Sequence, residues 1–435
     1  MRGKRRLRSV RWYEWFFPEM SIPRVARRAP SHDLVITDTT LRDGQQGSRP
    51  FTEEECIKIY ALLSELDNGS GVIRDIELFP YTAKDRRVIK TLIDFGTTPR
   101  PIGWIRASME DLRLVKESGL DTTVLLTSVS DYHIYHKLGI DREVAKGKFL
   151  SVIREALRIG LRVKVAMEDI TRSDIYGFVL PFMDEVMRIS ESEGVDVGFK
   201  LSDTLGLALP FPELPLPRSV PKLVRTLIDE LGLRSGQLEF HGHNDFHLVV
   251  ANHLAAWLYG ASLSNCTLMG IGERAGNCPL EAMAVLRSQL TEDDRMSLRA
   301  IGRIADLFRE MGFTVPKFYP LLGENAFSTK AGIHIDGLLK NPSIYLPFDP
   351  GMIGRPYSVE VSPYSGRAGL VYWLARRLNL RDWRVLKEDP RVELAYSEVM
   401  KLFENGRVDP LSEEEVMNLM RKYFPELSVV REQWQ

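Results

Sequence analysis

The stretch QLEFHGHND, residues 237–245, has the pattern of a short apolar strand that ends in polar side chains. Side chains two residues apart on a strand point to the same side, so His241 and His243 are neighbours with Gly242 between them. Seven other short apolar runs also predict strands: LVITDTT (34–40), IRDIELF (73–79), PRPIGWI (99–105), TTVLLTS (122–128), RVKVAME (162–168), VGFKLSD (197–203) and LSNCTLMG (263–270).

Amphipathic helical patterns separate these strands. In residues 53–66 apolar side chains recur at helical spacing, and Thr52 with Glu55 forms a capping box in front of them. Eight β/α repeats within about 250 residues match the number and length expected of a (β/α)8 barrel. We therefore predict an α/β fold with a TIM barrel. A doubly wound open sheet is the alternative, but the even spacing of the eight units favours closure.

The length of the chain, 435 residues, exceeds that of one ordinary domain. We expect a basic, aromatic N-terminal arm over 1–30 and the catalytic barrel over 31–295. A first subdomain would follow over 296–360, with LRAIGRIADLFREMG (298–312) as an amphipathic helix that leads into it. A second, mostly helical subdomain would occupy 361–435.

Composition excludes several classes of protein. The chain has 58 Lys and Arg against 59 Asp and Glu, and this balance argues against a nucleic-acid binder with a basic surface. No apolar run approaches the roughly 20 residues that a membrane span needs. The three cysteines are odd in number and far apart, so we expect no disulfide framework and a reducing, cytoplasmic location.

Polar residues follow the predicted strands one after another. They are Asp38 to Asp43, Glu77, Ser128, Glu168–Asp169, Ser202 to Thr204, and His241 with His243. The carboxyl ends of all strands in a (β/α)8 barrel meet on one rim, where such enzymes build their active sites. One such residue alone would often be a helix cap, but six groups on one rim predict an active site.

Two histidines and a carboxylate predict a divalent metal site. Asp43, in DTTLRDG, is the best carboxylate candidate, and three ligands leave open positions that suit a catalytic metal. Such a metal chelates a 2-oxo acid and polarises its carbonyl group. Arg42 is placed to stabilise the resulting alkoxide, or pairs with Glu77 or Asp38. Asn277 faces the metal or caps the next helix, and the histidine pair has a buried, hydrogen-bonded alternative.

Five motifs in order, DTTLRDGQQG, EDITRSD, SDTLG, HGHND and GIGERAGN, resemble the DRE-TIM metallolyase superfamily. Within it they are similar to the acyl-CoA-dependent Claisen enzymes, which include isopropylmalate, homocitrate and citramalate synthases. FSTKAGIHIDGLLKNPSIY (327–345) is similar to their segment beyond the barrel that supplies a catalytic histidine and tyrosine. TSVSDYHIYHKLG, EDITRSDIYGFVLPF, LPRSVPKL and NDFHLVVANHLAAWLYG resemble most the Re-citrate synthases.

The resemblance implies a role for each residue that matches a family motif. Asp43, His241 and His243 would hold the metal, with Asn277 near or on it, and Arg42 would stabilise the enolate or alkoxide. Gln46 and Thr204 would contact the 2-oxo acid. Glu168 and His334 would form the acid–base pair that deprotonates the methyl group of acetyl-CoA, with Tyr345 close by. For a second carboxylate of the acceptor we expect His133 and Arg172, which lie at or just beyond strand ends.

The resemblance also implies an activity. We expect an acyltransferase that condenses acetyl-CoA with a 2-oxo dicarboxylic acid, with oxaloacetate as acceptor and citrate and CoA as products. Homocitrate, isopropylmalate and citramalate synthesis are the alternatives, followed by a metal-dependent lyase or aldolase and then a non-catalytic binding protein. We expect Mn²⁺, with Mg²⁺, Co²⁺ and Zn²⁺ as alternatives, and a homodimer that binds neither nucleic acid nor membrane.

Overall fold

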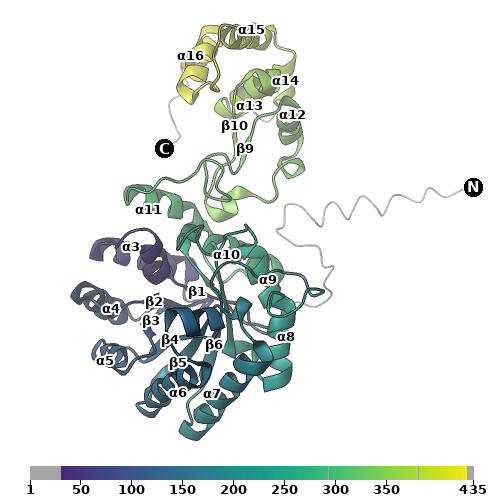
Figure 1. Ribbon diagram of the computed structural model, residues 1–435. Coiled ribbons are helices and arrows are strands. Elements are labelled where there is room, and N and C mark those ends of the chain that lie inside the picture. Colours follow the sequence, from purple (N-terminus) through teal and green to yellow (C-terminus); the bar gives the residue numbers. More distant parts are fainter. Residues whose placement is uncertain (1–30, 292, 381, 429–435) are drawn as a thin grey trace, which may run out of the picture. The chain divides into compact units, whose positions relative to one another are not determined.

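The computed structural model describes residues 31–428 except residues 292 and 381, so the N-terminal arm expected over 1–30 lies outside the described residues. The chain forms two compact units, one that runs to Phe313 and one that begins at Thr314. The first is a closed barrel of eight parallel strands, and all eight predicted strands are confirmed (Figure 1). They are β1 Val35–Asp38, β2 Ile73–Leu78, β3 Arg100–Arg106, β4 Thr122–Ser128, β5 Arg162–Glu168, β6 Val197–Asp203, β7 Leu238–Gly242 and β8 Leu263–Cys266.

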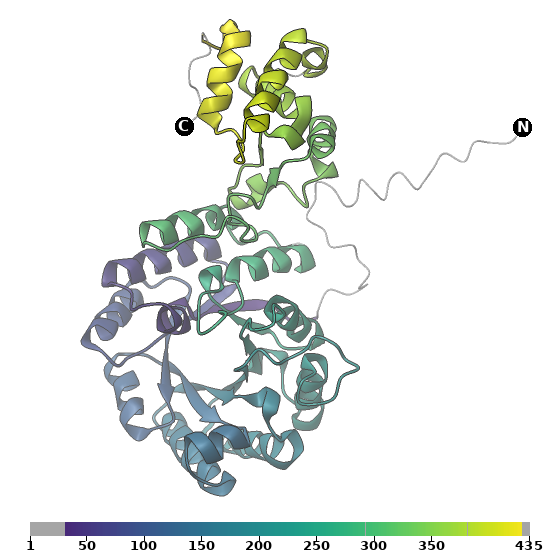
Figure 2. The same cartoon turned by 45° about the horizontal axis from the view of Figure 1, so that its top comes forward.

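Helices cover the outside of the barrel (Figure 2). They are α3 Glu53–Asp67, α4 Ala83–Phe95, α5 Met109–Glu117, α6 Arg142–Arg158, α7 Leu180–Glu193, α8 Val220–Leu231, α9 Val249–Tyr259 and α10 Leu280–Thr291. The predicted capping box of α3 is present, because Thr52 Oγ1 accepts from the Glu55 amide at 3.1 Å and Glu55 accepts from the Thr52 amide at 2.8 Å. No helix in the described part of the chain is both long and apolar enough to cross a bilayer.

The register of the strands places polar residues in one layer at the rim. Ser128 pairs with Glu168, Glu168 with Ser202, Ser202 with His241, and His241 with Asn265. Directly paired residues on neighbouring strands share a face of the sheet. The rim residues of β4 to β8 therefore face the same side because of backbone pairing alone.

A buried charge network fills one half of the barrel interior. The ammonium group of Lys200 contacts Glu77 and lies 3.2 Å from Glu239, and Lys164 bonds Glu239 at 2.7 Å and Asp75 at 2.9 Å. The other half is apolar, with a cluster that consists of Ile102, Val124 and Ala166, packed against Trp104 and Leu126. TIM barrels normally fill this space with branched apolar side chains, so the charges are a distinctive feature of this barrel.

Residues 298–312 differ from the single amphipathic helix that we expected. A 3-10 helix, Leu298–Arg303, is followed by a short α-helix, α11 (Ile304–Glu310). Gly302 lies at the change of geometry, and glycine is a poor helix former. The predicted apolar face is nevertheless buried, since Ile301, Ile304 and Phe308 are all inaccessible to solvent.

The second unit is mostly helical, as predicted for the C-terminal region. Strands β9 (Ser328–Thr329) and β10 (Ser358–Val359) pair in parallel. The helices are α12 Gly332–Lys340, α13 Gly366–Arg377, α14 Arg384–Lys387, α15 Pro390–Glu404 and α16 Glu413–Tyr423. Their core contains Leu370, Leu374, Val399 and Met420, which are fully buried.

The buried charges make a testable prediction for stability. Replacing Lys200 with Met leaves the carboxylates of Glu77 and Glu239 without their shared cation, so we expect a loss of about 3–5 kcal/mol in the free energy of unfolding. Urea denaturation measures this loss. Adding Glu239→Gln should recover part of it, and Lys58→Met, which breaks an exposed pair with Glu54, should leave the unfolding midpoint unchanged. Equal effects of Lys200→Met and Lys58→Met would contradict the role of the network.

Candidate active site

Asp43, His241 and His243 come together at the rim, as the sequence predicted. Asp43 lies in a single π-helical turn, Thr40–Gly44, that follows β1, and His241 and His243 lie at the end of β7. The Nε2 atoms of both histidines are 3.8 Å from Oδ2 of Asp43. One ligand atom from each of the three residues lies within 4.8 Å of the others, and all three side chains are buried.

The electrostatics of these three side chains suit a cation. Burial raises the pKa of Asp43, but the charge of Arg42 and the nearby imidazoles outweigh it, so the pKa of Asp43 falls below its ordinary value. Burial lowers the pKa of His241 and of His243. The group therefore offers one carboxylate and two neutral imidazoles, which are the protonation states that metal binding requires.

Hydrogen bonds around the three residues leave room for a ligand. Asn265 bonds Nδ1 of His241 at 2.8 Å, and this contact leaves Nε2 directed toward Asp43. Asn277 donates to Asp43 at 2.7 Å, whereas its own Oδ1 is buried without a hydrogen-bond partner, as is Nδ1 of His243. Buried polar atoms are rarely left unpaired, and a divalent cation bound here would account for the free oxygen. These residues fit a metal, with Asn277 at its edge.

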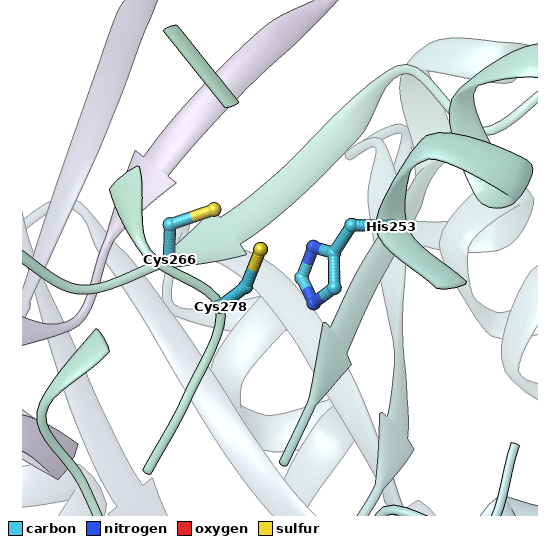
Figure 3. A group of neighbouring side chains, drawn as sticks. All are labelled: His253, Cys266 and Cys278. Carbon is cyan, nitrogen blue, oxygen red and sulfur yellow. The ribbon is translucent and has the colours of Figure 1, made fainter. Parts of the chain in front are cut away.

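A second group of potential ligands, His253, Cys266 and Cys278, lies behind β8 and is also buried (Figure 3). Nδ1 of His253 already bonds Ser264 at 2.7 Å, and the His253 ring packs edge to face on Phe240. Burial raises the pKa of the Cys278 thiol, which opposes the thiolate form that a metal needs. The contacts of these three residues are therefore those of a packed core. All three cysteines of the chain are free, as expected.

Arg42 is held in place beside the candidate metal ligands. Its Nη1 bonds Asp43 at 2.9 Å, its Nε lies 3.4 Å from Glu77, and its guanidinium carbon sits 4.5 Å from the centre of the Trp104 ring. Of the two expected alternatives for Arg42, the ion pair with Glu77 is present, and this pairing leaves the guanidinium beside Asp43. A preorganised guanidinium of this kind stabilises negative charge that develops next to it.

Glu77 and Asn265 connect the parts of the site. Glu77 accepts hydrogen bonds from Thr39 at 2.9 Å and from Asn265 at 3.3 Å, in addition to its contacts with Arg42 and Lys200. Asn265 therefore links two groups. One is the Glu77 carboxylate, which orients Arg42, and the other is the imidazole of His241. The sequence analysis gave Asn265 no role, although a buried amide inside the apolar run LSNC was an available signal.

Glu168 is surrounded by donors. Ser128 donates at 2.5 Å, and the Lys137 ammonium lies 2.8 Å from both carboxylate oxygens. Nδ1 of His133 is 3.0 Å from Oε2, without the alignment of a hydrogen bond. Burial raises the pKa of Glu168, but these neighbours lower it to about 2, so Glu168 is a carboxylate. The sequence analysis had given Lys137 no role.

The remaining substrate candidates of the barrel have different surroundings. Arg172 makes three contacts of 2.7–3.0 Å with the carboxylate of Asp169 through its Nε and Nη2. The hydroxyl of Thr204 accepts from the Asp169 amide at 2.8 Å. Gln46 is exposed on a short helix, α2 (Gln45–Gly47). The structure therefore joins Arg172 and Thr204 through Asp169.

His334 and Tyr345 belong to the second unit. Their rings are stacked, with centroids 4.1 Å apart and planes at 29°. Tyr345 is 40% exposed, and His334 is exposed as well. The pairing of these two residues, which was expected from their spacing within one motif, is thus present as a direct ring contact.

The chain is similar to known proteins along most of its length. Residues 33–308 match the HMGL-like family, and residues 321–384 match the homocitrate synthase post-HMGL domain-like family. Citrate (Re)-synthase of Clostridium kluyveri is 41% identical, over 96% of this chain and 94% of the relative. 2-Phosphinomethylmalate synthase of Streptomyces hygroscopicus is 38% identical, over 90% of each chain.

Among solved structures, the HMG-CoA lyase of Bacillus subtilis superimposes with a TM-score of 0.53 over 66% of this chain and 97% of the lyase. At 17% identity, this likeness concerns the fold alone. The family matches confirm the resemblance that the five motifs predicted. The chain therefore belongs to the HMGL-like family and carries a homocitrate synthase post-HMGL domain-like region after its barrel.

Proposed function

We propose that this protein is an acyltransferase that condenses acetyl-CoA with oxaloacetate to form citrate and CoA. The observation that carries the proposal is the rim layer, which holds Glu168 on β5 and His241 on β7, two strands apart. Neighbouring strands lie about 4.8 Å apart, so a base and a metal site separated by roughly 10 Å can serve two substrates at once. The similarity to Citrate (Re)-synthase along nearly the whole chain supports oxaloacetate as the acceptor.

The reaction needs a base for a weak carbon acid. Glu168 and His334 act as the acid–base pair that removes a proton from the thioester methyl group, with Tyr345 beside His334. The carbanion attacks the carbonyl carbon of the acceptor, and water then releases CoA from the thioester. A cation held by Asp43, His241 and His243 supplies Lewis-acid polarisation of that carbonyl. Arg42 stabilises the alkoxide, and Thr204 binds the 2-oxo acid, together with Gln46.

Recognition of a second carboxylate falls to the cations near Glu168. We assign this role to His133 before Arg172, because the guanidinium of Arg172 is already engaged by Asp169. Lys137 is a further cation at the same edge of the barrel. A substrate carboxylate that binds to these side chains replaces contacts that His133 and Lys137 make with Glu168 in the free enzyme.

A second candidate function is the synthesis of 2-phosphinomethylmalate, the product named for the relative from Streptomyces hygroscopicus. Removing an acetyl unit from that product leaves a three-carbon 2-oxo acid with a phosphinate in place of one carboxylate. The identity of 38% over 90% of both chains favours this candidate over homocitrate and isopropylmalate synthesis.

The proposal also includes the identity of the metal ion, the oligomeric state and the cellular compartment. Two imidazoles and a carboxylate suit Mn²⁺, as well as Mg²⁺, Co²⁺ and Zn²⁺. Three free, buried cysteines are compatible with a reducing, cytoplasmic environment. The resemblance to the Claisen enzymes supports a homodimer, which light scattering of the purified protein measures directly.

The acceptor is tested by the release of CoA from acetyl-CoA. The protein with Mn²⁺ is offered oxaloacetate, its phosphinate analogue, 2-oxoglutarate, 2-oxoisovalerate and pyruvate in parallel. We expect kcat/KM for oxaloacetate to exceed that for 2-oxoisovalerate and for pyruvate by roughly 100-fold, because a site built for two anions leaves charges unpaired when the acid carries only one. Among the dianionic acids, oxaloacetate should give the highest kcat/KM. Preference for the phosphinate would support the second candidate. Release with 2-oxoisovalerate or pyruvate alone would contradict a dianionic acceptor. Once the acceptor is known, labelled acetyl-CoA shows which face of its carbonyl group is attacked.

The metal site is tested by replacing His241 with Ala. We expect the bound Mn²⁺ to fall from one per chain to near zero, and activity to fall about 100-fold or more, because a lost ligand costs more than a lost outer-shell contact. Elemental analysis and calorimetric titration with Mn²⁺ measure the loss. His136→Ala, at an exposed histidine, is the matched control and should keep both properties. Retention of metal and activity in His241→Ala would remove these residues from the site.

The base is tested by Glu168→Gln. The amide keeps the shape of the side chain but accepts no proton, so we expect kcat to fall about 10²–10⁴-fold while KM for the acceptor stays within a few-fold. The exchange of deuterium into the acetyl-CoA methyl group should be lost in parallel. Glu143→Gln, at an exposed carboxylate of α6, is the control. Unchanged methyl exchange in Glu168→Gln would exclude it from the acid–base pair.

A further inference from the structure

Gly337 lies where a side chain cannot fit. It is buried inside helix α12, three residues before the helix ends at Lys340. A Cβ atom on Gly337 would lie 2.5 Å from Cε2 and 2.9 Å from Cδ2 of Tyr345. Both distances are shorter than carbon atoms tolerate without moving. Glycine is less favourable than alanine inside a helix, so its presence here calls for a packing reason.

That reason is the path of the Tyr345 ring. A tight turn at Pro342–Ile344 follows α12, and the Tyr345 amide donates to the Pro342 carbonyl at 3.2 Å. Asn341 fixes the turn, because its side chain accepts from the Ser343 amide at 3.0 Å. The turn brings the Tyr345 ring back across the surface of α12 at Gly337, where it reaches the His334 ring one helical turn earlier.

We propose that Gly337 is a positioning residue that allows Tyr345 to stack on His334 and thereby fixes the orientation of the imidazole. A face-to-face stack leaves both ring nitrogens at the edge, free for proton transfer. It also places an aromatic face beside the imidazolium that forms when His334 takes a proton, which is a favourable cation–π arrangement. The chemical part of this inference rests on the proposed function, whereas the packing part does not.

The packing part is tested with Gly337→Ala in three backgrounds. We expect Tm to fall by about 3–6 °C in the wild type and in Tyr345→Phe, which keeps the ring, and to rise in Tyr345→Ala, which removes it. Scanning calorimetry of the whole chain measures Tm. The matched control is Gly147→Ala, in helix α6 with no atom within 4 Å of the added methyl group, and it should raise Tm in every background. A loss of Tm for Gly337→Ala in Tyr345→Ala as large as in the wild type would overturn the inference.

The orientation of His334 is tested by its own signal. The chain has eight histidines, so NMR of the histidine-labelled protein can resolve the His334 ring protons, with His334→Ala for assignment. The Tyr345 ring should shift these protons upfield in the wild type and in Tyr345→Phe, and Gly337→Ala should abolish most of the shift. We also expect kcat/KM to fall at least about tenfold in Gly337→Ala. An unchanged His334 signal would overturn the inference, and an inactive wild type with the expected NMR and Tm results would contradict only the proposed function.

Discussion

The buried carboxylate of Glu77 is the contact on which the rim and the interior of the barrel both depend. One oxygen receives Thr39 and Arg42, and the other receives Lys200 and Asn265. A carboxylate fully removed from water is stable only when cations and donors surround it. Glu77 therefore fixes the position of the Arg42 side chain at the rim and that of Lys200 in the barrel interior. Through Asn265 it also sets the ring orientation of His241.

The charges of the barrel interior explain why the site can be rigid. With Leu or Val at this level of the barrel, the Arg42 side chain could adopt several rotamers. The buried charge network instead holds its guanidinium in one position, between Glu77 and Asp43. Breaking such a network is costly, because each member that is lost leaves a charge unpaired in a dry interior. In the apolar half of the barrel, the ring of Trp104 gives the Arg42 guanidinium a flat surface to pack on. Stability and orientation thus come from the same contacts.

The sequence predicted the barrel and its metal candidates because both follow from short-range patterns. Strands end where polar residues begin, and the parallel register then brings His241 and Asp43 to one rim. The contacts of Lys137 could not be predicted in this way, because they depend on a π-helical turn, Tyr132–Lys137, that returns the side chain to Glu168. The break within residues 298–312 was missed because amphipathic periodicity does not distinguish a 3-10 turn from an α-helix of the same polarity. The packing of Gly337 could not be predicted either, because the space that its side chain would need is taken by a ring that a separate turn brings back, that of Tyr345.

The low pKa of Glu168 constrains how the proposed acid–base pair divides its work. A carboxylate with a pKa of about 2 is a weak base, so it does not hold the methyl proton for long. In the proposed acid–base pair, the methyl proton would therefore be passed on to His334 rather than stay on Glu168. The acceptor changes this balance: a second carboxylate that draws His133 and Lys137 away from Glu168 removes two of the neighbours that keep its pKa low. Binding of the dicarboxylic acid would then raise the basicity of Glu168 just before the methyl group is deprotonated.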